Sequence, residues 1–123
     1  MANRGDEEQY LRVLDLVAII SELLNEIASQ EEIRNHKLAK MLLGSVRFSM
    51  MELASTLRAF PPKLKGEHPE ISWGAFELTE TMSLWREPQL NSTVLLHRFD
   101  ATLIAIQKLL LSEMLASSLE DFN

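Results

Sequence analysis

Residues 38–62 read LAKMLLGSVRFSMMELASTLRAFPP, and this stretch decides the fold of the chain. Its apolar side chains recur at intervals of three and four residues, which places them on one face of an α-helix. They are Leu38, Leu42, Val46, Met50, Leu53, Leu57 and Phe60. Met41 and Phe48 widen this face, so we expect a helix that is buried in a bundle or shared with a partner. Pro61 and Pro62 end the helix, because neither has a backbone N–H to donate.

The same periodicity and the start and stop signals along the chain predict four helices. We expect them over about residues 6–28, 31–60, 72–86 and 92–118. A turn near Ser29 and Gln30 should separate the first two, with one long kinked helix as the alternative. Residues 61–71 should form a loop, since they hold Gly66 and Pro69. These elements predict a single all-α domain over residues 1–123, with its core in about residues 6–118.

Three long helices and one short helix indicate an up-and-down four-helix bundle, and a three-helix bundle with a long loop is the alternative. In the short helix, Trp73, Phe76 and Met82 should face the core. The last helix has a core-facing set of apolar and small residues. This set is Leu95, Phe99, Thr102, Leu103, Ile106 and Leu110.

A second apolar stripe lies on the last helix, more than about 60° from its core face at the helical 100° per residue. It comprises Ile104, Leu111 and Leu115, with His97 on the same side. A helix that is apolar on two faces must bury both, so we expect this stripe to be an interface in a homodimer or with a protein partner. Trp85 lies roughly opposite Trp73 around the short helix, and we expect it to contribute to binding as well.

Composition excludes several classes of protein. The 123 residues contain no Cys, which excludes a disulfide framework, a thiolate zinc site and a cysteine nucleophile. The net charge of −6 argues against attraction of nucleic acid by the whole molecule. The longest apolar stretch, residues 101–111, is interrupted by Gln107 and Lys108 and is too short to cross a membrane. We therefore expect a cytoplasmic protein without a membrane segment.

Positive charge is concentrated in residues 33–65, which hold 7 basic side chains and 1 acidic side chain. On the central helix, Lys40, Arg47 and Arg58 share one azimuth and form what we call the basic strip. The strip is a candidate binding surface for an acidic partner or for phosphate. It carries no interleaved aromatic residue, so support for nucleic acid is weak. Solvation, or neutralisation by acidic neighbours, is the simpler interpretation.

No pattern of catalytic or metal-binding residues stands out. His36, His68 and His97 lie far apart in the sequence, and none occurs in a metal-ligand spacing. The chain has no glycine-rich phosphate loop and no nucleophile elbow. We therefore predict no metal, no cofactor and no catalytic residue.

One segment resembles a known family. Residues 68–73 read His-Pro-Glu-Ile-Ser-Trp, after a basic stretch and a helix containing Met51-Glu52-Leu53-Ala54. This arrangement is similar to the HepT-like proteins of the HEPN superfamily, over about residues 38–85. The resemblance implies a HEPN-like helical bundle, usually dimeric, that often pairs with a nucleotidyltransferase-like protein in a toxin–antitoxin system. Active members of the family are metal-independent ribonucleases that use an Arg, four to six residues and then a His, just after the Trp.

The chain departs from the family at that ribonuclease motif. No Arg precedes any His at the required spacing, and Glu80-Thr81 and Trp85 stand where the Arg-Asn pair and the His are expected. Three hypotheses follow. In the first, the chain is a HepT-like protein that has lost catalysis and kept its binding surfaces. In the second, it is a ribonuclease or nucleotide-processing enzyme with a rearranged site around His68, Glu52 or the basic strip. In the third, it is an unrelated helical adaptor or regulatory protein.

Overall fold

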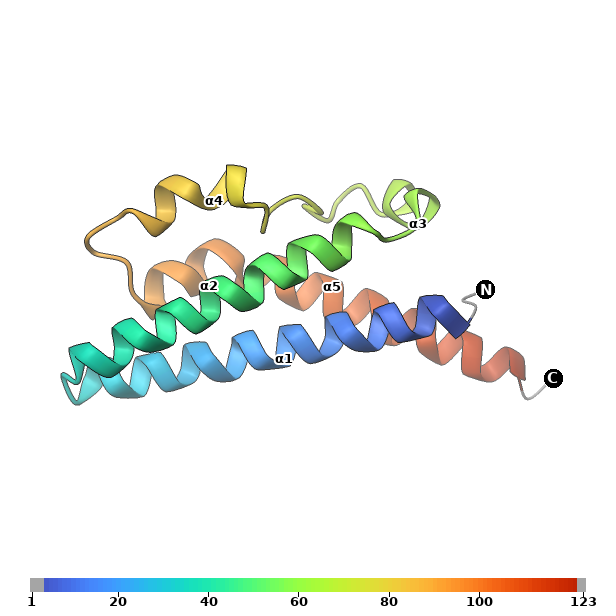
Figure 1. Ribbon diagram of the computed structural model, residues 1–123. Helices are drawn as coiled ribbons and strands as arrows, with labels where there is room; N and C mark the ends of the chain where they lie inside the picture. Colours follow the sequence, from blue (N-terminus) through green and yellow to red (C-terminus); the bar gives the residue numbers. More distant parts are fainter. Residues whose placement is uncertain (1–3, 122–123) are drawn as a thin grey trace.

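The computed structural model describes residues 4–121, with side chains described for residues 6–119. The fold is all-α over this range, as predicted, and no strand occurs in it. The elements are α1 (Arg4–Glu32), α2 (His36–Arg58), α3 (Pro62–Glu67), α4 (Leu78–Trp85) and α5 (Ser92–Asp121). Figure 1 shows three long helices side by side, with α3, α4 and their loops above them.

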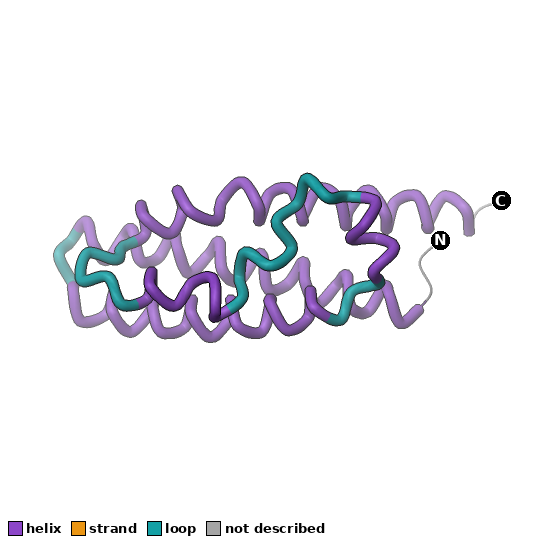
Figure 2. The backbone as a smooth tube through the Cα atoms, turned by 90° about the horizontal axis from the view of Figure 1, so that it is seen from above, coloured by secondary structure: helices purple, strands orange, loops and turns teal. Residues whose placement is uncertain are grey.

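The helix α1 is the hub of the packing, because it contacts both α2 and α5 along its length. Both neighbours run antiparallel to it. Its end lies beside the start of α5, where the Ser92 N–H donates to Glu31 Oε1 at 2.9 Å. Its beginning lies beside the end of α5, where the Ser117 hydroxyl donates to Glu7 Oε1 at 3.4 Å. From above, the segment from α3 to α4 crosses the long helices as a partly helical strap (Figure 2).

The core follows the predicted apolar faces closely. Val13, Val46 and Ile106 are fully buried at its centre. On α5 the predicted core residues Leu95, Phe99, Leu103, Ile106 and Leu110 are buried, while Thr102 is half-buried at the edge. Met82 was expected to face inward, and that prediction is wrong: its side chain is exposed on α4.

The turn between α1 and α2 lies four residues later than predicted. The helix α1 continues through Ser29 and Gln30, and the reversal occurs at residues 33–35. Arg34 adopts a left-handed backbone with φ of 62°, which redirects the chain. Asn35 then caps α2 by accepting a hydrogen bond from the Leu38 N–H at 3.3 Å. An Asn cap therefore sets this boundary, although Ser29 with Glu32 three residues later also has the pattern of a helix start.

The predicted loop over residues 61–71 contains the short helix α3. Pro61 occupies its N-cap position and Pro62 its first turn, where a missing N–H costs nothing. Leu64 is buried and fixes α3 to the core. The helix predicted from Ser72 begins six residues later, because successive turns occupy residues 68–77.

Candidate functional site

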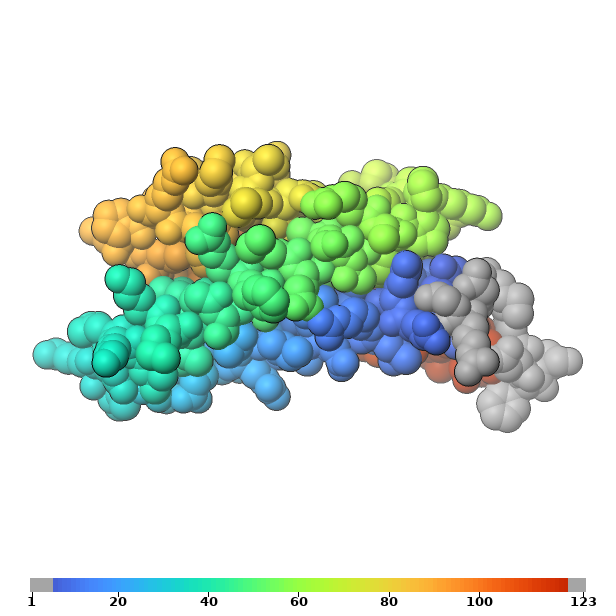
Figure 3. All heavy atoms as spheres, viewed as in Figure 1, coloured from blue at the N-terminus to red at the C-terminus, as the bar shows by residue number. Residues whose placement is uncertain are grey.

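A groove of about 910 Å³ lies between the first half of α2 and the connection from α4 to α5. Lys40, Leu43 and Arg47 line it from α2, and Trp85 and Leu90 line it from the other side. In Figure 3 the surface is hollowed between the teal and green atoms of α2 and the orange atoms of the connection. The groove therefore joins two parts of the sequence that were predicted separately as binding residues, the basic strip and Trp85.

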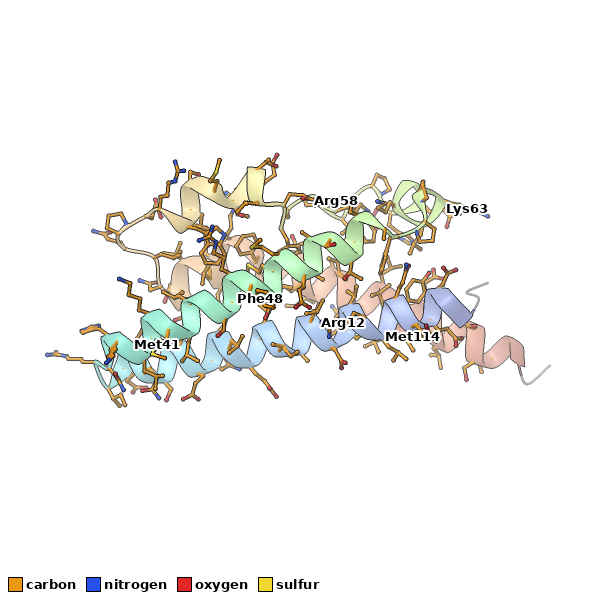
Figure 4. All side chains as sticks on the ribbon, viewed as in Figure 1. Arg12, Met41, Phe48, Arg58, Lys63 and Met114 are labelled. Carbon is orange, nitrogen blue, oxygen red and sulfur yellow. The ribbon has the colours of Figure 1, made fainter. Side chains whose placement is uncertain are left out.

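The structure divides the basic strip. Lys40 and Arg47 are exposed side chains in the groove, and no ion pair within 4.0 Å involves either of them among the described residues. Arg58 lies near the other end of α2 and is paired with Glu77 (Figure 4). Arg12 on α1 is likewise paired with Glu52. Two members of the strip are therefore available to a ligand, while the third is engaged within the chain.

The Arg58–Glu77 pair connects α2 to the start of α4. Arg58 Nε donates to Glu77 Oε1 at 3.1 Å, and Arg58 Nη2 donates to Glu77 Oε2 at 2.6 Å. The hydrogen bond from Arg58 lowers the pKa of Glu77, against the opposing effect of burial. It also raises the pKa of Arg58. This bidentate geometry gives Arg58 a structural role in holding residues 68–77 against α2.

Replacing Glu77 should make the melting temperature of the protein depend less on pH in the acid range. Because the pKa of Glu77 is lowered in the folded state, its ionised form stabilises the fold above the ordinary carboxyl pKa. That contribution disappears as the pH falls through the lowered pKa. We expect Glu77→Gln to reduce Tm slightly at pH 7, since the pair is partly exposed, and to leave Tm unchanged near pH 2. Thermal unfolding at several pH values, with Glu80→Gln as the control, tests this; an equal deficit at every pH would contradict it.

Trp85 is held in place within the chain. Its indole N–H donates to Thr81 Oγ1 at 3.1 Å, and the Thr81 hydroxyl donates to the Glu77 carbonyl at 3.1 Å. The ring is half-buried and packs against the core. The polar atom of Trp85 is thus satisfied, and the part of the ring that reaches the groove offers an apolar surface.

Gly44 also lines the groove, at the middle of α2. A glycine inside a helix is about 1 kcal/mol less stable than alanine. Here a Cβ would meet nothing within 4 Å, and Gly44 has no positive φ. Neither packing nor backbone conformation within the chain therefore requires glycine at this position.

The second candidate surface is the outer side of α5. Ile104, Leu111 and Leu115 are 41%, 52% and 62% exposed. Leu119, which was not singled out from the sequence, is exposed as well and continues the stripe toward the end of the helix. We call these four residues the outer stripe. His97 is exposed near its start.

A further apolar area lies on the near face in Figure 4, where Met41 and Phe48 project from α2. Both were predicted to widen the buried face of this helix. Both are exposed, because at 100° per residue they lie roughly 140° and 160° around α2 from the buried Val46.

Residues 68–73 have a structural role in this fold. The Trp73 indole N–H donates to the His68 carbonyl at 3.0 Å, and its ring contacts Phe60 with centroids 6.1 Å apart. His68 Nδ1 lies 3.3 Å from Glu70 Oε1. These contacts close residues 68–73 into a compact turn that leads to α4. His36 and His97 belong to other parts of the fold, and no cluster of three potential metal ligands occurs among the described residues.

Residues 92–119 of α5 contain an 18-residue window that is apolar enough to cross a membrane, with a mean hydropathy of 1.3. Only 22% of that window is buried within the protein, although the core face of α5 packs against α1. Gln107 and Lys108 interrupt this window, so the longest apolar stretch, residues 101–111, does not reveal it. Comparisons with family models, curated proteins and solved structures found no match to the chain.

Proposed function

We propose that this chain is a catalytically degenerate HepT-like protein of the HEPN superfamily, which acts in the cytoplasm by forming a homodimer and binding a protein partner. In this proposal α1, α2, α4 and α5 are the four helices of a HEPN-like bundle, with α4 as the short one. A nucleotidyltransferase-like protein in a toxin–antitoxin or defence system is the partner that the family resemblance favours.

The exposed outer stripe on α5 carries the proposal. Its residues repeat at intervals of seven and four along the helix, which is the spacing of a helix–helix contact. Asp100 and Lys108 are exposed on the same helix, and a lipid environment would have to accommodate both charges. A second copy of the chain can offer these charges water or opposite charges, which the interior of a bilayer cannot. A dimer therefore covers the apolar stripe better than a membrane does.

Glu80 and Trp85 support the non-catalytic part of the proposal. Glu80 is an exposed carboxylate at the position where the family carries its phosphate-binding Arg, and it would repel an RNA phosphate. Trp85 stands at the position of the catalytic His, and an indole cannot transfer a proton at neutral pH. Loss of both functions at matching positions is expected of a relative kept for binding.

Sedimentation velocity tests this proposal. At about 100 μM we expect the wild-type chain to sediment as a dimer and Leu111→Glu/Leu115→Glu to sediment as a monomer, because each interface would bury charges without partners. Met41→Glu/Phe48→Glu, which alters the other apolar area, should remain a dimer. A monomeric wild type, or equal behaviour of both variants, would overturn the proposed dimer. Flotation of the wild-type chain with lipid vesicles would instead assign the stripe to a membrane.

A further inference from the structure

We infer that the groove between α2 and the α4–α5 connection binds an acidic segment of a protein partner, with an apolar side chain of that segment inserted between Leu43 and Trp85. This inference rests on the proposed function only in taking the ligand to be a protein. It does not depend on the outer stripe of α5 or on dimerisation.

The charges of the groove define the ligand. Lys40 and Arg47 are seven residues apart on α2, so they project from one side of the helix about 10 Å apart. Acidic side chains outnumber basic ones by 18 to 12 in this chain, yet neither cation has an acidic partner among the described side chains. Two carboxylates on one side of a ligand helix, two turns apart, match this spacing.

Gly44 gives the groove its shape. It lies between the two cations along α2 and contributes no side chain to the groove. No atom of the chain lies within 4 Å of a Cβ built at Gly44, so this part of α2 is open to contact from outside. A ligand backbone can therefore approach α2 closely at this point, and its apolar side chain can reach the half-buried Leu43, Trp85 and Leu90.

The acidic residues of the groove favour a peptide over a nucleic acid. The Glu31 carboxylate lines the groove and is held there by a hydrogen bond from the Ser92 N–H. Glu87 is exposed and lines the groove from the α4–α5 connection. A nucleic acid carries a charge at every nucleotide and would bring phosphates close to both carboxylates. A peptide can place its acids at Lys40 and Arg47 alone and its apolar residues beside the glutamates.

The experiment is an NMR titration of the 15N-labelled full chain with defined peptides. The test peptide is a helical peptide of about 16 residues with a central Leu and Glu residues seven apart; the control peptide carries Lys at those Glu positions. We expect the acidic peptide to shift the indole N–H signal of Trp85 and to leave that of Trp73 in place, with the Trp85 signal assigned through Trp85→Phe. No shift up to about 1 mM peptide, or an equal shift with the Lys peptide, would overturn the inference. A larger shift with a short single-stranded RNA would also overturn it.

Three variants sharpen the test. Lys40→Glu/Arg47→Glu should weaken binding of the acidic peptide by at least about tenfold, while the exposed Lys63→Glu on α3 should leave it unchanged. Gly44→Ala should raise Tm and weaken binding at the same time, a combination that damage to the fold cannot produce. Unchanged binding in Gly44→Ala or in the double variant would refute the groove as the site. Leu111→Glu/Leu115→Glu should still bind the peptide, which separates failure of this inference from failure of the proposed dimer.

Discussion

Phe60→Ala should reduce the free energy of unfolding by about 3–5 kcal/mol, as expected for a large aromatic side chain removed from a core. Phe60 is 2% exposed and lies just past the end of α2. Its ring contacts Tyr10 of α1 with centroids 5.5 Å apart and Trp73 of the turn at 6.1 Å. The variant therefore creates a cavity where α1, α2 and the segment leading to α4 meet. Urea unfolding followed by circular dichroism measures the loss.

Phe48→Ala is the matched control for this prediction. Phe48 lies on α2 and is 64% exposed, so its removal should change stability by less than about 0.5 kcal/mol. The indole N–H signal of Trp73 provides a second measurement, because Phe60→Ala should move it and Phe48→Ala should not. Similar losses of stability in the two variants would show that Phe60 does not hold these segments together.

Ile106→Ala should weaken folding, whereas Ile104→Ala should weaken self-association. Ile106 is 0% exposed in the core, while Ile104 is 41% exposed in the outer stripe. We expect Ile106→Ala to cost about 2–5 kcal/mol, which lowers Tm by roughly 10–20 °C for a chain of this size. Ile104→Ala should leave the stability of the monomer within about 0.5 kcal/mol and weaken the proposed dimer.

Measurements at two protein concentrations separate these effects. At low concentration, where the monomer predominates, only Ile106→Ala should unfold at a markedly lower temperature. At high concentration, sedimentation should report a weaker dimer for Ile104→Ala. If Ile104→Ala destabilises the monomer as strongly as Ile106→Ala, the outer stripe is part of the core rather than an interface.

The boundary between α1 and α2 shows that local sequence signals do not fix the exact position of a helix end. Two start signals compete there, Ser29 with Glu32 and Asn35 alone, and both have the residue types of an N-cap. The helix continues past the first because residues 29–32 keep their helical hydrogen bonds, and Ile27 and Leu24 remain in the core. Periodicity locates the apolar face of a helix, but it does not select between two adjacent caps.

The basic strip shows a second limit. Helical geometry correctly places Lys40, Arg47 and Arg58 on one azimuth of α2, yet it treats them as equivalent. Arg58 is bound by Glu77, which lies 19 residues later and comes into reach only when residues 68–77 fold back along α2. The tertiary contact therefore decides which cations of the strip remain available.

The sequence by itself determined that the chain is all-α, most of the residues that form the core faces of α2 and α5, and that α5 has a second apolar side. These features depend on spacings of three, four and seven residues, which any helix converts into faces. Only the tertiary structure decided that Lys40, Arg47 and Trp85 share a groove with Gly44. That groove exists because the α4–α5 connection is held beside α2, partly through the hydrogen bond between Glu31 and Ser92, 61 residues apart. Such pairings depend on the packing of the whole chain and are not encoded in any local repeat.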